Sequence, residues 1–241
     1  AVSLTNDRSD APVVNVNLPA GSSAKVEVPV GNVTAGTVAV LVNEDGTEEV
    51  IKTSVPTESG LVLTVEDGAT IKIVDNSKTF EDVPEAYWGA DEIDFATSRE
   101  LFTGTSETAF SPEDDMTRAM VVTVLARYEG VDTSTGDTWY DAGTQWAVEN
   151  GVSDGSNLDQ SITREQLVTM LYRYAGEPAV SGGMSGFSDS AAVSDYAADA
   201  MAWAVENGII TGMGDGTLNP QGTATRAQVA AILARFVENM A

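Results

Sequence analysis

A short helical pattern occurs three times after residue 79, and this repeat limits the possible folds more than any other feature of the sequence. Each copy contains a threonine and an arginine just before an apolar-periodic run: Thr117-Arg118, Thr163-Arg164 and Thr225-Arg226. Each threonine stands where a helix N-cap is expected, because its side chain can accept hydrogen bonds from first-turn N–H groups. Such a tandem repeat predicts helical units that bury their apolar faces against one another.

The three copies differ in length. Each opens on an aromatic residue followed two positions later by an aspartate: Phe80 and Asp82, Trp139 and Asp141, Phe187 and Asp189. A helix and a glycine-containing turn follow in each copy, and the helices carry Phe95, Trp146 and Trp203. These aromatic residues have Ala and Val neighbours and are expected in the core. We expect repeats at about 79–131, 137–177 and 186–241, with the first helix of the second copy truncated.

The first 76 residues have a different pattern. Apolar residues alternate with polar ones in short Val-rich runs, such as residues 61–65 and 70–73, and turn segments such as Asp67-Gly68 separate them. This pattern predicts about six short antiparallel strands in a small sandwich or open barrel. With no recognisable chemistry in it, this segment is interpreted as a spacer or cap. The predicted fold is α+β in two domains, residues 1–76 and 79–241, with a boundary near 76–79.

Composition excludes several classes of function. The formal net charge is −25, which disfavours nucleic acid and anionic membranes as partners. The chain has no Cys and no His, so thiol or imidazole catalysis and zinc-finger sites are excluded, and we expect no cofactor or metal. No apolar run is long enough for membrane insertion. The chain begins at Ala1 without a basic and apolar leader, and we interpret it as a mature or excised piece of an exported protein.

Each Thr-Arg helix carries a second arginine nine residues after the first, on the opposite helix face. The later set lies in the last turns, where the helix dipole favours a cation: Arg127, Arg173 and Arg235. The first-turn set lies where the dipole disfavours a cation, so these residues need another explanation: Arg118, Arg164 and Arg226. They could form internal ion pairs with Asp82, Asp141 or Asp189. Alternatively, they could bind an anion together with free helix N–H groups and a glycine turn.

The pattern Phe-x-Asp-Val, then a glycine turn, then Thr-Arg-Ala resembles the S-layer homology domain. The second copy departs from it, because Glu165 follows Arg164 and the copy is short. The resemblance implies a mainly α bundle of three repeats with pseudo-threefold symmetry and grooves between neighbouring units. It also implies non-covalent binding of secondary cell wall polysaccharide, often carrying a pyruvate ketal, which tethers exported proteins to a bacterial envelope.

The resemblance also implies roles for particular residues. Arg118, Arg164 and Arg226 would meet the ketal carboxylate, and Arg164 would contribute least because its copy is short. The glycine turns would offer backbone N–H groups from Gly104, Thr105, Gly155, Ser156, Gly212 and Met213. Trp88 and Tyr196 would line the sugar face, although core packing is the alternative for both.

We therefore predict a secreted, cell-wall-bound anchoring module that belongs to a larger surface protein. The alternative is a structural S-layer or adhesion protein whose bundle makes protein contacts. An enzyme is not expected: although the chain has 37 carboxylates, no arrangement of nucleophile, base and orienting group is visible.

Overall fold

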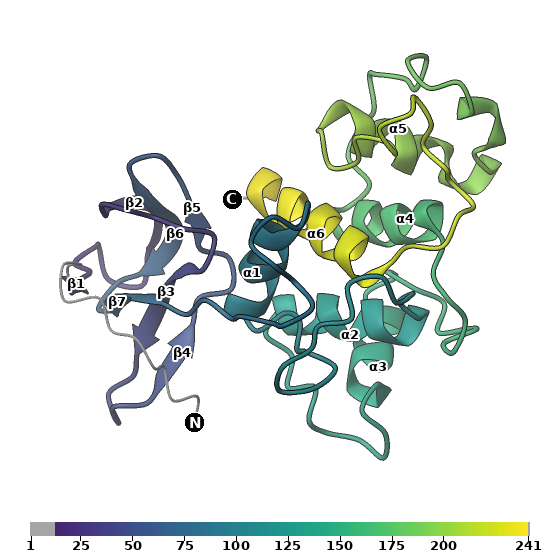
Figure 1. The fold of residues 1–241 in the computed structure, drawn as a ribbon. Coiled ribbons are helices and arrows are strands. Elements are labelled where there is room, and N and C mark those ends of the chain that lie inside the picture. Colours follow the sequence, from purple (N-terminus) through teal and green to yellow (C-terminus); the bar gives the residue numbers. More distant parts are fainter. Residues whose placement is uncertain (1–12, 241) are drawn as a thin grey trace. The chain divides into compact units, whose positions relative to one another are not determined.

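The computed structural model describes residues 13–240, and residues 1–12 of the predicted β-rich segment lie outside them. Two compact units are present, one ending at Phe110 and one spanning Ser111–Asn239. Strands occupy the described chain up to residue 75 and helices follow it, as Figure 1 shows. The predicted α+β class is confirmed.

The first unit contains two antiparallel sheets. One has the strand order β1-β7-β3-β4 and the other β2-β6-β5. Branched apolar side chains from both sheets form a shared core that includes Val28, Leu61, Leu63 and Ile73. The strands among the described residues are β1 (Val14–Asn15), β2 (Ser23–Pro29), β3 (Thr37–Val42), β4 (Glu48–Val50), β5 (Val55–Pro56), β6 (Gly60–Glu66) and β7 (Thr70–Asp75).

Helix α1 (Ala90–Ser98) also belongs to the first unit, because a buried arginine joins it to the sheets. The guanidinium of Arg99 donates to the carbonyl oxygens of Ser54 (2.8 Å), Ala35 (2.8 Å) and Thr37 (3.1 Å). Its side chain is fully buried and lies 3.7 Å from the ring centroid of Phe95. The first compact unit therefore extends to Phe110, well past the predicted boundary at 76–79.

The helices of the second unit are short, and their starts follow the predicted caps. The side chains of Thr117 and Thr163 accept from the N–H groups of Met120 and Gln166. Among residues 13–240, no helix is both long and apolar enough to cross a membrane. The α-helices that begin in this unit are α2 (Arg118–Tyr128), α3 (Asp141–Glu149), α4 (Arg164–Tyr174), α5 (Ala198–Glu206) and α6 (Arg226–Met240), and two 3₁₀ turns, Ser190–Ala192 and Asp195–Ala197, precede α5.

A closed ring of three backbone hydrogen bonds joins the starts of α2, α4 and α6. The N–H of Met116 donates to the carbonyl of Ala224 (3.1 Å), that of Ala224 to Ile162 (2.9 Å), and that of Ile162 to Met116 (2.8 Å). All three residues are buried. Backbone groups alone thus close this ring between segments that lie far apart in the sequence.

The other ends of the same helices meet through three aromatic rings. Tyr128, Tyr174 and Phe236 each lie ten residues after the first-turn arginine of their helix. Their ring centroids are 5.8 to 6.3 Å apart with edge-on geometry, which aromatic rings prefer. Helices α2, α4 and α6 therefore contact one another at both ends.

Candidate functional site

At the starts of α2, α4 and α6, the first two N–H groups are already bonded to carbonyl oxygens of another copy. The N–H of Arg118 donates to the carbonyl of Gln160 (3.0 Å), and that of Ala119 to Leu158 (2.9 Å). The same arrangement recurs at Arg164 and Glu165, which donate to Gly222 and Pro220, and at Arg226 and Ala227, which donate to Asp114 and Pro112. The prediction of free helix N–H groups is wrong, because a loop of another copy crosses each helix start. These six N–H groups are therefore not available to an anion.

Four of the predicted turn donors are already engaged inside their own turns. The N–H of Thr105 donates to the carbonyl of Ala109, and that of Met213 to the carbonyl of Thr217. The N–H of Gly155 donates to the Ser153 hydroxyl, and that of Ser156 to the Asp154 carboxylate. Gly104 and Gly212 have a packing role: an added Cβ would lie 2.8 Å from the Phe80 ring and 2.7 Å from the Phe187 ring.

Arg118 of the first copy contacts the glycine turn of the second. Its Nε–H donates to the carbonyl of Ser156 (3.0 Å), and its Nη2 contacts a carboxylate oxygen of Asp154 (3.0 Å) and the hydroxyl of Ser153 (3.4 Å). The Asp154 side chain is 69% exposed and that of Arg118 is 12% exposed. An ion pair was one of the two alternatives for Arg118, but its partner is none of the three aspartates that the sequence suggested.

Arg164 contacts the third copy in the same way, but without a carboxylate. Its Nε–H donates to the carbonyl of Leu218 (2.8 Å), and Nη1 contacts the side-chain oxygen of Gln228 (3.4 Å). The residue is 3% exposed, and burial lowers the pKa of the Arg164 guanidinium. The N–H of Gln228 donates to the hydroxyl of Thr225 (3.3 Å), which caps α6. Arg226 is 8% exposed.

The predicted aspartates bind backbone N–H groups. Asp82 accepts from the N–H of Phe110 (2.8 Å), and Asp189 accepts from those of Leu218 and Asn219 (2.8 Å each). The bond from Leu218 is the main cause that lowers the pKa of Asp189. Asp141 instead accepts from its own loop, at Asp137 and Thr138. In the short second copy Asp154 performs the equivalent task, because it accepts from the N–H of Ser156 (3.0 Å).

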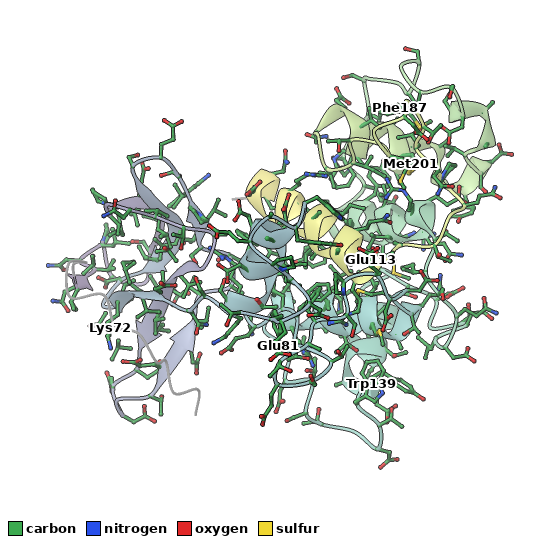
Figure 2. The ribbon with its side chains drawn as sticks, in the orientation of Figure 1. Lys72, Glu81, Glu113, Trp139, Phe187 and Met201 are labelled. Atoms are coloured by element: carbon green, nitrogen blue, oxygen red, sulfur yellow. The ribbon has the colours of Figure 1, made fainter. Side chains whose placement is uncertain are left out.

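Three aromatic side chains at matching positions are exposed. Trp88, Trp139 and Tyr196 are 57%, 53% and 55% exposed, and each lies seven residues before the core-side aromatic residue of its copy. Trp139, labelled in Figure 2, therefore corresponds to Trp88 and Tyr196, whereas its alignment with Phe80 and Phe187 is wrong. Core packing, the alternative for Trp88 and Tyr196, is also wrong. Of the helix aromatics expected in the core, Phe95 and Trp203 are buried and Trp146 is half-buried.

A pocket of about 270 Å³ lies within the second unit and collects residues from all three copies. Arg173 lines it with an exposed guanidinium that makes no hydrogen bond or ion pair with any described residue, a position that the helix-dipole argument did not predict. The hydroxyl of Tyr196 donates to Glu165 (3.0 Å), which orients the ring. The lining residues are Arg118, Ser153, Asp154, Ser156, Asn157, Gln166, Thr169, Met170, Arg173 and Tyr196.

The pocket combines two guanidinium groups, of Arg118 and Arg173, with the carboxylate of Asp154 and the phenol of Tyr196. Two guanidinium groups can form charge-assisted hydrogen bonds to a carboxylate. The pKa of Tyr196 is raised to about 12, first by desolvation and then by its bond to Glu165, so the hydroxyl stays neutral at ordinary pH. Within residues 13–240, no three carboxylates gather closely enough to hold a metal ion.

Comparisons with known proteins match two of the three predicted copies. The S-layer homology domain family matches residues 79–119 and 186–230, which fall in the first and third copies. The chain is 32% identical over 182 residues to an amylopullulanase of Thermoanaerobacterium thermosulfurigenes, covering 67% of this chain and 10% of that protein. It is 31% identical over 199 residues to the exoglucanase XynX of Acetivibrio thermocellus, covering 74% and 18%.

An S-layer protein is also among the relatives. The S-layer protein sap of Bacillus anthracis is 26% identical over 182 residues, which cover 70% of this chain and 22% of that protein. The chain therefore spans less than a quarter of the length of these curated relatives.

Proposed function

The chain carries S-layer homology domain segments, and from this premise we propose that it anchors a larger protein to a bacterial cell envelope. The domain and the S-layer relatives indicate a location at the cell surface. Two glycan-degrading enzymes and S-layer proteins share this region as a minor part of their length. Enzymes and S-layer proteins can share a segment that attaches them to the same surface, whereas an S-layer protein has no use for the catalytic part of an enzyme. The chain itself is therefore proposed to be non-catalytic.

The proposed architecture is a bundle of three repeats with pseudo-threefold symmetry. The cyclic hydrogen bonds of Met116, Ile162 and Ala224 support it, as do the edge-on rings of Tyr128, Tyr174 and Phe236. The second copy completes the bundle although it lacks the opening segment of the other two. In this arrangement, each first-turn arginine is expected to face the turn of another copy.

The proposed ligand is an acidic cell wall polysaccharide that carries a carboxylate, such as a pyruvate ketal. The observation that carries this proposal is the pocket in which Arg118 and Arg173 lie with the exposed ring of Tyr196. A carboxylate would be bound by guanidinium groups, and the apolar face of a sugar could stack on the ring. The exposed Trp88 and Trp139 support further sugar contacts at matching positions.

The geometry supports a different order among the first-turn arginines from the one the sequence suggested. The shortened turn of copy 2 faces Arg118, whereas Arg164 is buried against copy 3. Arg164 and Arg226 are therefore proposed to stabilise the fold, with Arg118 and Arg173 making the ligand contacts of this pocket.

A pull-down with purified cell wall sacculi tests the proposal. Wild-type protein should bind untreated sacculi and lose binding after mild acid has removed the ketals. Arg173→Ala should bind at least tenfold more weakly, because it removes the unpaired cation, and Lys25→Ala is the charge-matched control on an exposed strand position. Equal binding of Arg173→Ala and Lys25→Ala would contradict the assignment of this pocket.

The alternative is a structural S-layer or adhesion role through protein contacts. The exposed ring of Trp139, which lies 5.2 Å from that of the partly buried Tyr140, favours it, because aromatic residues are enriched in protein interfaces. Soluble wall polysaccharide should compete with sacculi under the anchoring proposal, and it should leave protein contacts unaffected.

A further inference from the structure

Asp154 lies inside the proposed ligand pocket and forms an ion pair with Arg118, one of the two arginines of the pocket. Its carboxylate oxygen is 3.0 Å from Nη2 of Arg118 and also accepts from the N–H (3.0 Å) and hydroxyl (2.9 Å) of Ser156. A ligand carboxylate at the same guanidinium edge would be brought next to a second negative charge. Both carboxylates cannot use that edge at the same time.

The third copy shows that such a turn does not need this ion pair. Asp215 accepts from the N–H (3.0 Å) and hydroxyl (2.6 Å) of Thr217, as Asp154 does from Ser156. Asp189, which holds the N–H of Leu218 as Asp154 holds that of Ser156, acts on Arg164 only electrostatically, and Arg164 forms no ion pair with any described residue. The pair between Arg118 and Asp154 is therefore an addition to the turn rather than a requirement of its geometry.

We propose that Asp154 is an internal competitor for the anion, which occupies Arg118 in the unliganded pocket and lowers the affinity for acidic ligands. The proposal rests on the function proposed above. Arg118 would stay in place when Asp154 leaves, because its Nε–H is held separately by the carbonyl of Ser156. Asp154 can leave readily, because its side chain is 69% exposed and can be rehydrated.

This competition affects selectivity as well as affinity. An anion that contacts only Arg118 replaces one exposed ion pair with another. Because exposed ion pairs contribute little free energy, such an anion gains little by displacing Asp154. A ligand that also contacts Arg173 and Tyr196 gains enough contacts to displace it. The pocket would therefore favour a carboxylate presented on a sugar over a small free anion.

The test uses the full chain with two probes, a methyl hexoside carrying a pyruvate ketal and free pyruvate, titrated by calorimetry. Asp154→Asn keeps an oxygen that can accept from Ser156 and removes the charge. We expect it to bind the ketal about three- to tenfold more tightly and free pyruvate more tightly by at least the same factor. Asp215→Asn, the matched control, should bind both probes as wild type does. Asp154→Ser repeats the test if the first variant melts at a lower temperature.

Each outcome decides between the two proposals. Wild-type binding of the ketal with unchanged or weaker binding by both Asp154 variants would overturn the inference and leave the proposed function intact. Failure of wild type and variants alike to bind either probe would overturn both. A gain in affinity that persists in Arg118→Ala/Asp154→Asn would also overturn the inference, because the released residue would not be Arg118.

Discussion

The Nε–H of Arg99 donates to the carbonyl oxygen of Ser54 at 2.8 Å, and this bond ties the first repeat helix to the β-sheets. Asn150 and Asn207 occupy the matching positions of the other copies and only donate back to the carbonyls of Trp146 and Trp203. Arg99 makes the equivalent contact to Phe95 (3.2 Å) and extends further into the sheets. Arg99 therefore adds contacts to the sheets that the matching asparagines do not make, beside the bond from the Asn76 side chain to the carbonyl of Ser98 (2.6 Å).

Replacing Arg99 by asparagine should lower the free energy of unfolding by about 2–5 kcal/mol, because buried carbonyls of Ser54, Ala35 and Thr37 lose their donor. Urea unfolding measures the effect, and the exposed Lys25→Gln is the control. In a fragment of residues 79–241, which follows the boundary suggested by the sequence, Arg99→Asn should be nearly neutral. A similar cost in the fragment and the full chain would contradict this account of the junction.

Arg118→Ala and Arg164→Ala should behave differently. Arg164 is buried and contacts Leu218 and Gln228, so its loss should cost about 2–4 kcal/mol of stability. Arg118 is paired with the exposed Asp154, and its loss should cost about 1 kcal/mol or less while weakening binding to sacculi. Thermal melting and the pull-down separate the two effects, and equal changes in melting temperature would count against the proposed division of roles.

Gly212→Ala should be more destabilising than Gly214→Ala, although both residues have positive φ angles, of 81° and 86°. An added Cβ at Gly212 would lie 2.7 Å from the Phe187 ring and 2.7 Å from the carbonyl of Thr217, while nothing lies within 4 Å at Gly214. Gly214→Ala is therefore the control and should lose only about 1 kcal/mol of stability, from placing a non-glycine residue at a positive φ angle. Chemical denaturation of both variants should reveal a further cost of about 1–3 kcal/mol at Gly212.

Tyr128 should make the fold sensitive to alkali. Burial, with a contribution from Glu129, raises the pKa of Tyr128 to about 12. A raised folded-state pKa stabilises the protein below the unfolded pKa of about 10, and this contribution is lost as pH rises towards 12. Wild type should therefore lose about 1 kcal/mol more than Tyr128→Phe between pH 7 and 11. Phe236 shows that a ring without a hydroxyl suits the matching position, and identical pH profiles would exclude Tyr128 as the cause.

The parts of the fold that depend on neighbouring residues could be predicted from the sequence. The Thr-Arg pairs located the starts of α2, α4 and α6, because capping and apolar spacing act within one or two helical turns. Alternation of apolar residues identified the strands for the same reason. The repeat also located the arginines, although it left open whether each one pairs inside the protein.

Contacts between copies were decided by the tertiary structure. Neither the pairing of Arg118 with Asp154, 36 residues later, nor the entry of Arg173 into the pocket follows from local spacing. The alignment of Trp139 also needed the structure, because the deletion in copy 2 removed the segment that would have fixed its register. Local rules determine where helices begin and which faces are apolar. Which turn meets which arginine depends on how three helices pack together, and only the folded chain specifies that.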